Sequence, residues 1–238
     1  MSAPLELHIK KKTYQGAEGG EVEAVRDLHL LAPAGSLTAL IGPSGCGKTT
    51  SLRILARLDT RFEGTIGLPP AARIGFVFQE PRLLPWRTVE QNVRLVMEGG
   101  GADLDALFAE LGLEDMRNRF PTELSLGLAR RVSIARALAI EPDVLLLDEP
   151  FTSLDETTAQ RLRQLVLTVW RRYQPTTLMV THNVREAIQL AERIVLLAPR
   201  PSHVVAEIVL DTPHEQRDEV FVEATRTDLV GRYPGLIA

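Results

Sequence analysis

A glycine-rich segment at residues 42–49 constrains this chain more than any other feature of its sequence. It reads Gly-Pro-Ser-Gly-Cys-Gly-Lys-Thr and fits the pattern G-x-x-x-x-G-K-[S/T]. Residues 37–41 before it form a continuous apolar run, and residues 48–58 after it have helical spacing. A short apolar run of this kind predicts a strand covered on both faces, which is typical of parallel sheets. We therefore expect an α/β fold in which this segment joins a central strand to a helix.

The residue types of this segment suit the binding of phosphate. Its glycines let the backbone close around phosphate oxygens, and the start of the following helix offers unpaired N–H groups and the positive end of a dipole. Lys48 adds a mobile positive charge, and the hydroxyl of Thr49 is an oxygen ligand of the kind that Mg²⁺ prefers. We predict that the phosphate chain of a nucleotide binds here. The residues expected to contact it are Gly42, Pro43, Ser44, Gly45, Cys46, Gly47, Lys48, Thr49 and Thr50.

A second apolar run, at 144–147, ends in the acidic pair Asp148 and Glu149. Alone, an acidic pair before Pro150 is as consistent with a strand end and a turn as with a binding site. Ligands of α/β folds bind at the carboxyl ends of strands, so the phosphate loop elsewhere in the chain favours a site. We expect Asp148 to hold Mg²⁺ through its water shell and Glu149 to act on the attacking water as a general base. The predicted chemistry is hydrolysis of Mg-ATP.

The remaining patterns place both motifs in a single domain that spans residues 1–238. Further apolar runs predict additional strands of a mostly parallel core sheet at 74–78, 177–180 and 194–197. Leu5, Leu7 and Ile9 alternate with polar residues, which predicts a smaller antiparallel sheet within 5–32.

Helical spacing dominates residues 80–142, which we interpret as an all-helical insert. Its helices are expected at 88–97, 104–111 and 125–139, with a break at Gly99, Gly100 and Gly101. A C-terminal part, 199–238, is expected to contain an alternating strand at 204–210 and a helix at 215–230.

Composition excludes several classes of protein. The chain has 238 residues, of which 45% are hydrophobic and 24% charged, as in ordinary globular proteins. Its net charge of -4 argues against a broad basic face, so we expect no nucleic-acid partner. Cys46 is the only cysteine, and residues 1–12 carry charges where a secretory leader is apolar. Since no apolar run approaches the roughly 20 residues of a membrane span, we expect a cytoplasmic protein that reaches a membrane only through partners.

With further motifs in the same order along almost the whole chain, the sequence resembles the ATP-binding subunit of an ATP-binding cassette (ABC) transporter. The resemblance implies the ABC ATPase fold, a P-loop NTPase core with an N-terminal antiparallel β subdomain and an all-helical insert. It implies ATP and Mg²⁺ as cofactors. In that family an aromatic residue before the phosphate loop stacks on adenine, and Tyr14 is the matching residue, although a surface tyrosine is also common.

The resemblance also implies roles for polar residues beyond the two motifs. Gln79 matches a glutamine that reaches Mg²⁺ and the attacking water, and His182 matches a histidine that contacts the γ-phosphate. Asp155, in Ser-Leu-Asp, matches a loop that crosses to a second subunit. The implied catalytic residues are Lys48, Gln79, Glu149 and His182. The implied metal-site residues are Thr49, Gln79 and Asp148.

The chain departs from the family at its signature, Leu-Ser-Gly-Gly-Gln, which here reads Leu-Ser-Leu-Gly-Leu from Leu124 to Leu128. Ser125 and Gly127 are retained, and Ser125 is expected to cap a helix whose positive end faces ATP on a second subunit. Two alternatives stand for Leu126. Either the backbone there requires a positive φ, which strains a leucine, or it is ordinary and Leu126 packs against the insert. The neighbouring leucines favour packing.

Two loops suggest a subfamily and partners. Residues 79–87 contain Pro85 and Trp86, and Trp86 either contacts a partner helix or packs the insert onto the core. This segment and the run Ala-Pro-Arg-Pro at 198–201 are similar to subunits of nitrate, sulfonate and taurine importers.

The resemblance implies a motor subunit, a homodimer or a heterodimer with a paralogue, on the cytoplasmic face of the inner membrane. Its partners are membrane-spanning permease subunits and, indirectly, a solute-binding protein. The alternatives are a soluble non-transport ABC ATPase and another P-loop NTPase. A soluble ABC ATPase would need a long coiled-coil insertion or a second cassette, and the sequence shows neither. Another P-loop NTPase would share the phosphate loop but would not account for Gln79, Ser125, Asp155 and His182.

Overall fold

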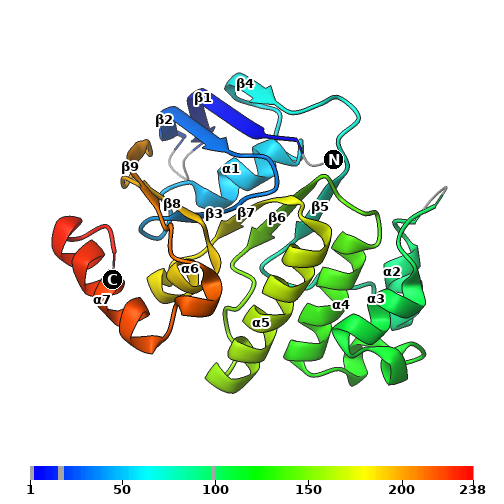
Figure 1. Cartoon of the computed structure of the whole chain (residues 1–238). Coiled ribbons are helices and arrows are strands. Elements are labelled where there is room, and N and C mark those ends of the chain that lie inside the picture. Colours follow the sequence, from blue (N-terminus) through cyan, green and yellow to red (C-terminus); the bar gives the residue numbers. More distant parts are fainter. Residues whose placement is uncertain (1–2, 16–18, 98–99, 238) are drawn as a thin grey trace.

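Two β-sheets and three groups of helices form the structure, a computed structural model that describes residues 3–15, 19–97 and 100–237 (Figure 1). The expected break at Gly99 lies outside the described residues. The larger sheet has the strand order β5-β6-β7-β3-β8-β9. Its first five strands are parallel, whereas β9 (Val204–Val209) pairs antiparallel with β8. The parallel strands are β3 (Leu37–Ile41), β5 (Ile74–Val77), β6 (Val144–Asp148), β7 (Thr176–Val180) and β8 (Arg193–Leu197).

These strands confirm the mostly parallel sheet predicted from the apolar runs, with ends that differ by one residue at most. Successive residues of β6 face opposite sides, so Val144 and Leu146 enter one hydrophobic cluster and Leu145 and Leu147 enter the other. Both faces are therefore buried, which explains why the strand has no polar alternation.

The smaller sheet is antiparallel and has the order β2-β1-β4. β1 (Leu5–Gln15) and β2 (Glu21–Ala32) were expected, but β4 (Glu63–Gly67) was not. Its sequence, Glu-Gly-Thr-Ile-Gly, is mostly exposed and has two residues with low strand propensity. Gly64 has φ +149° and lies so close to β1 that a Cβ would be 2.0 Å from the carbonyl oxygen of His8. Glycine is therefore required where β4 meets β1.

Helices cover both faces of the larger sheet. α1 (Lys48–Leu55) lies between the two sheets, and α5 (Glu156–Tyr173) and α6 (Val184–Leu190) lie on the opposite face (Figure 1). The helix expected at 48–58 ends three residues early because Arg57 takes a positive φ of 58° and its N–H bonds to the oxygen of Ile54.

The helical insert contains α2 (Val89–Arg94), α3 (Leu104–Leu111) and α4 (Leu126–Leu138). Short 3₁₀ helices follow α3 at Glu114–Met116 and Pro121–Glu123. The side chains of Thr88, Asp103 and Ser125 accept hydrogen bonds from the first turns of the three helices, which fixes where each begins.

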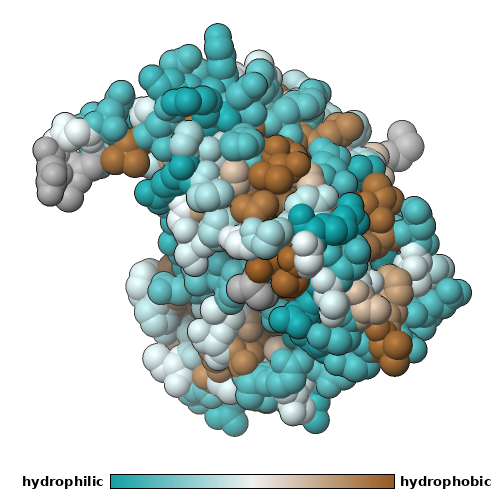
Figure 2. All heavy atoms as spheres, turned by 90° about the vertical axis from the view of Figure 1, so that its left-hand side faces the viewer, coloured by the Kyte–Doolittle hydropathy of each residue, from teal (hydrophilic) through white to brown (hydrophobic). Residues whose placement is uncertain are grey.

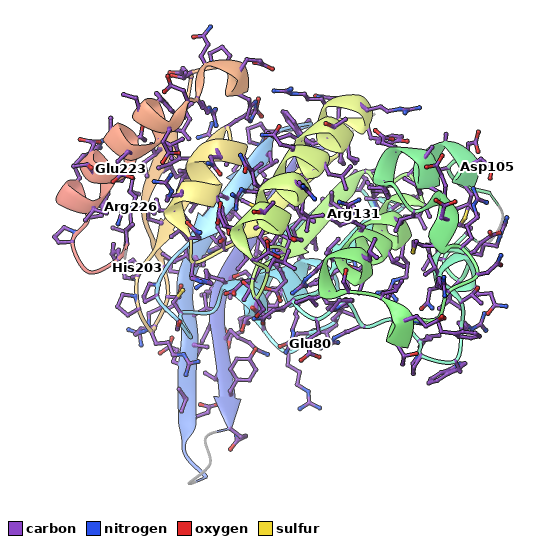
Figure 3. The ribbon with its side chains drawn as sticks, turned by 90° about the horizontal axis from the view of Figure 1, so that it is seen from below. Glu80, Asp105, Arg131, His203, Glu223 and Arg226 are labelled. Carbon is purple, nitrogen blue, oxygen red and sulfur yellow. The ribbon has the colours of Figure 1, made fainter. Side chains whose placement is uncertain are left out.

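The C-terminal part lies at the other end of the molecule. A 3₁₀ helix (His214–Gln216) precedes α7 (Glu219–Arg232), which begins four residues later than expected because Asp218 caps it. Asp105 of α3 and Glu223 of α7 lie at opposite sides of the view in Figure 3.

The surface on the side of β9 and α7 is mixed in character. Figure 2 shows apolar patches separated by hydrophilic residues, and Val205, Val209 and Val220 of these two elements are exposed. No described helix is at once long enough and apolar enough to cross a membrane.

Candidate functional site

The strand order brings the predicted motifs to one edge of the larger sheet. Parallel strands place their carboxyl ends on the same side, and β7 and β8 are the two neighbours of β3. The loops that follow β7 and β8 therefore flank the phosphate loop, which follows β3. The acidic pair ends β6, next to β7.

The phosphate loop is packed tightly against its surroundings. A Cβ on Gly42 would lie 2.8 Å from the Cys46 Sγ, and Gly47 has φ +106°, a conformation that favours glycine. The Lys48 side chain is buried, and its Nζ donates to the carbonyl oxygens of Gly42 at 2.6 Å and Pro43 at 3.1 Å. The lysine is thus held within the loop, without an ion-pair partner in the described part of the chain.

A cavity of about 340 Å³ opens beside this loop. It is lined by Tyr14, Ala24, Ser44, Gly45, Gly47, Lys48, Thr49, Thr50, Arg53, Glu149 and Arg200. Six of the nine residues expected to contact phosphate line this cavity: Ser44, Gly45, Gly47, Lys48, Thr49 and Thr50. Gly42 and Pro43 accept hydrogen bonds from Lys48, and Cys46 is buried. Tyr14 and Glu149, far apart in the sequence, face the same space.

Thr49 and Asp148 form the candidate metal site. The Thr49 hydroxyl donates to the Asp148 Oδ1 at 3.0 Å, so two hard oxygen donors lie side by side at the cavity. Burial raises the pKa of Asp148, and the hydrogen bond from Thr49 opposes that shift. The two groups fit the oxygen chemistry of Mg²⁺, which typically takes few protein ligands together with phosphate oxygens.

Glu149 is held in an unusual backbone conformation. Its φ is +45°, and its N–H donates to the carbonyl oxygen of Val180 at 2.9 Å. Its carboxylate accepts a hydrogen bond from the Thr152 hydroxyl at 3.0 Å and lies 3.2 Å from the His182 Nδ1. Non-glycine residues in this region of φ are uncommon and cluster at functional sites. The conformation turns the carboxylate from the strand end toward the cavity.

Tyr14 is fixed by a network that the sequence did not reveal. Its hydroxyl lies 3.0 Å from the Thr50 Oγ1 and donates to the Asp59 Oδ2 at 3.3 Å. Lys12 is only 3% exposed, donates to Asp59 at 2.8 Å and to the Arg61 oxygen at 2.7 Å, and lies 4.6 Å from the centre of the Tyr14 ring. Tyr14 therefore lies at the surface, 39% exposed, with its hydroxyl held by Thr50 and Asp59.

The altered signature begins α4 with ordinary backbone geometry. Ser125 is the N-cap and its Oγ accepts from the Leu128 N–H at 3.3 Å, as expected. Leu126 is the first helical residue and is not among the described residues with positive φ. Leu124 and Leu128 pack on the core, but Leu126 is 40% exposed. The backbone at Leu126 is thus ordinary in the single chain, as the packing alternative expected, although the side chain is only partly buried.

The other sequence-predicted residues do not line the cavity. Gln79 follows β5 and is exposed, and Asp155 is the N-cap of α5, accepting from the Thr158 N–H at 3.0 Å. Gly127 lies beside the same helix end, because a Cβ there would be 2.7 Å from the Thr158 Cγ2. The starts of α4 and α5 thus form one surface that carries Ser125, Gly127 and Asp155. That surface is separate from the chain's own cavity lining.

Sequence reasoning missed two arginines that line the cavity, Arg53 and Arg200. Arg53 follows the glycine pattern by one helical turn and had no distinguishing signal. Arg200 lies in the Ala-Pro-Arg-Pro run at 198–201. It reaches the phosphate loop only because β3 and β8 are neighbouring strands, which the sequence does not reveal.

Comparisons with known proteins agree with this arrangement. The family described as "ABC transporter" matches residues 25–152, more than half of the chain. The chain belongs to the ABC transporter family. The aliphatic sulfonates import ATP-binding protein SsuB 2 of Burkholderia cenocepacia is 42% identical over 225 residues, covering 90% of this chain and 82% of the relative. SsuB of Bacillus licheniformis is 38% identical over 219 residues, covering 88% and 86%.

Solved ABC cassettes have the same fold. A dimeric post-hydrolysis structure of the cassette MJ0796 bound to ADP and Pi is 30% identical, with a TM-score of 0.74 over 88% of this chain and all of that one. A second dimeric MJ0796 structure, titled a bacterial ABC transporter cassette, has a TM-score of 0.75. These likenesses confirm the expected ABC ATPase fold and the expected similarity to the sulfonate importer group. The chain is the ATP-binding, ATP-hydrolysing subunit of an ABC transporter. The family match and the relatives favour this function over a soluble ABC ATPase or another P-loop NTPase.

Proposed function

We propose that this ABC subunit binds Mg-ATP in the cavity beside its phosphate loop and hydrolyses it to drive solute import. The observation that carries the proposal is the convergence of Lys48, Thr49 and Glu149 on one cavity. Asp148 is bonded to Thr49, and His182 lies against Glu149, so each candidate group has a partner in the site.

Binding uses both ends of the nucleotide. Tyr14 stacks on adenine, while the loop amides and Lys48 hold the phosphates, for which Lys48 gives up its bonds to the loop carbonyls. Thr49, Asp148 and Gln79 are the residues that would hold Mg²⁺. The ion would supply positive charge against the negative charge of the phosphates.

Hydrolysis depends on the placement of one carboxylate. Glu149 orients the attacking water and accepts its proton, and Thr152 and the tight backbone at Val180 keep the carboxylate in position. His182 contacts the γ-phosphate. Its backbone is anchored because the Asn183 N–H donates to the hydroxyl of buried Thr181 at 3.0 Å, and Asn183 caps α6.

A second copy or a paralogue completes each site. Ser125, Gly127 and Asp155 lie away from their own cavity, as residues that act on a partner's nucleotide do, and the capped start of α4 offers free N–H groups to a γ-phosphate. The dimeric MJ0796 structures support this arrangement. Among the described residues, no group of three or more His, Cys, Asp or Glu side chains could hold a metal ion.

Permease subunits dock on the insert side. Trp86 is 71% exposed and so does not join the insert to the core. Arg82 of the same loop lines a groove of about 390 Å³ together with Phe76 and Leu95. A loop that carries an exposed aromatic and borders an apolar groove suits a helix of a membrane subunit. We place the chain on the cytoplasmic face of the inner membrane, with a solute-binding protein acting indirectly.

The proposed solute is a small anion of the aliphatic sulfonate class. Support comes from the names of the relatives, which are import ATP-binding proteins for aliphatic sulfonates. Uptake of labelled alkanesulfonates by the reconstituted transporter tests this. Uptake of nitrate without uptake of alkanesulfonates contradicts it.

Two variants test the nucleotide site by calorimetry and steady-state turnover. Lys48→Ala is expected to abolish binding or hydrolysis, and Glu149→Gln is expected to keep ATP binding while turnover falls by at least about a hundredfold. Lys10→Ala and Glu141→Gln, which change exposed residues, are the matched controls. Unchanged affinity and turnover in Lys48→Ala contradicts the assignment.

A further inference from the structure

We propose that Arg200 is a positioning residue of the nucleotide site, which holds the phosphate loop from outside and adds positive charge for the phosphate chain. This inference rests on the proposed function. It concerns a residue to which neither the loop motif nor the acidic pair gives a role.

The fold itself brings Arg200 to the phosphate loop. β8 is a neighbour of β3 in the parallel sheet, so the segment after β8 lies beside the loop after β3. This segment is tied to β2 by two backbone hydrogen bonds, from the Arg26 N–H to the Ser202 oxygen and from the Ser202 N–H to the Ala24 oxygen, both at 3.0 Å. Arg200 is therefore presented by a short, doubly anchored connection.

The guanidinium lies directly on the loop backbone. The Arg200 Nε donates to the carbonyl oxygen of Gly45. Gly45 has φ +75°, and a Cβ there would lie 3.3 Å from the Arg200 Nη2. The guanidinium thus covers the one face of Gly45 that a side chain would occupy. The N–H of the same peptide group, that of Cys46, donates to the Pro43 oxygen at 3.2 Å, so this peptide group of the loop is held at both its oxygen and its nitrogen.

The charge of Arg200 is also available to the cavity. Arg200 lines the cavity together with Lys48 and Thr49, and within the described ranges it has no carboxylate at ion-pair distance. By contrast, Arg193 at the start of β8 pairs with Glu207 at 3.1 Å. A cation without a carboxylate partner beside a phosphate loop attracts a polyanion, in addition to its contact with the loop backbone.

Calorimetric binding of Mg-ATP, Mg-ADP and AMP to the full chain tests the role of Arg200. Arg200→Gln is expected to weaken ATP binding roughly five- to tenfold, and the loss of affinity should be smaller for ADP and smallest for AMP. The difference in affinity between wild type and variant should decrease as salt is raised from about 0.05 to 0.5 M. Arg200→Lys keeps the charge without the planar fork, so it is expected to restore part of the affinity and the salt dependence. Arg193→Gln is the matched control and is expected to change nothing.

The outcomes separate the inference from the proposed function. Equal affinity of wild type and Arg200→Gln for ATP overturns the role of Arg200 alone. An equal loss for all three nucleotides, with a lower melting temperature, makes Arg200 a structural residue and also overturns it. Absence of saturable ATP binding by the wild-type chain overturns the nucleotide site, and the inference with it.

Discussion

Leu126→Gly tests what the altered signature does. Leu126 is the first residue of α4, has no positive φ and is 40% exposed, so glycine relieves no strain. Glycine costs up to about 0.8 kcal/mol relative to leucine in a helix, and loss of the partly buried side chain costs roughly 1 kcal/mol more. We expect a total destabilisation of about 1–2 kcal/mol, or a fall in melting temperature of about 2–8 °C for a chain of this size.

The assay combines thermal unfolding with steady-state ATP turnover. We expect a lower melting temperature and no gain in turnover, because the backbone of the signature is already helical with leucine in place. Val220→Gly is the control, since Val220 is exposed and lies in the first turn of α7, outside the insert. A several-fold rise in turnover for Leu126→Gly, without a similar rise for Val220→Gly, would refute the reasoning and indicate that the closed dimer requires a conformation reserved for glycine.

Three further outcomes are expected. Burial raises the pKa of the Cys46 thiol despite the opposing charge of Lys48, so alkylation should be slow near neutral pH, speed up at high pH and slow further with ATP; equal labelling by mass spectrometry with and without ATP contradicts the loop placement. Lys12→Met removes the cation that pairs with Asp59 and lies against the Tyr14 ring, so it should destabilise the fold by about 3 kcal/mol. It should also weaken the binding of ATP more than the binding of inorganic tripolyphosphate. Equal weakening of both ligands argues against a role of Lys12 in base binding. Ser125→Ala removes the cap of α4 and should cost about 1 kcal/mol in chemical denaturation, and an unchanged midpoint would mean that the cap is replaced by water.

Local patterns predicted the parts of this fold whose residues carry their own signal. The phosphate loop was predictable because glycine spacing, a buried strand and a helix start coincide within 37–55, and α4 because Ser125 precedes a helical run. β4 was not, since it depends on the edge that β1 offers rather than on its own residues. The exposed side chain of Leu126 was also missed, because the leucine spacing alone does not say which side of the first helical turn faces the core.

Long-range placement decided the rest of the candidate site. Nothing near Arg200 or Lys12 in the sequence indicates that one reaches Gly45 and the other Asp59, since both contacts require the order of strands in the two sheets. The positive φ of Glu149 likewise comes from a bond to Val180 on the adjacent strand. Residue types thus predicted the chemistry, whereas the sheet order determined which cations and hydrogen bonds accompany it.

One buried side chain explains how the helical insert is joined to the hydrolytic edge. Arg130 of α4 is 3% exposed and donates to the carbonyl oxygen of Phe78, just before Gln79, and to that of Thr152, whose hydroxyl holds Glu149. Each broken bond would leave a buried polar group unsatisfied, at a cost of about 1–3 kcal/mol. A shift of α4 that breaks both hydrogen bonds therefore costs more free energy than a shift in which the Phe78 and Thr152 segments move together with α4. Arg130 thus joins the signature helix both to the segment that precedes Gln79 and to Thr152, whose hydroxyl hydrogen-bonds to the Glu149 carboxylate.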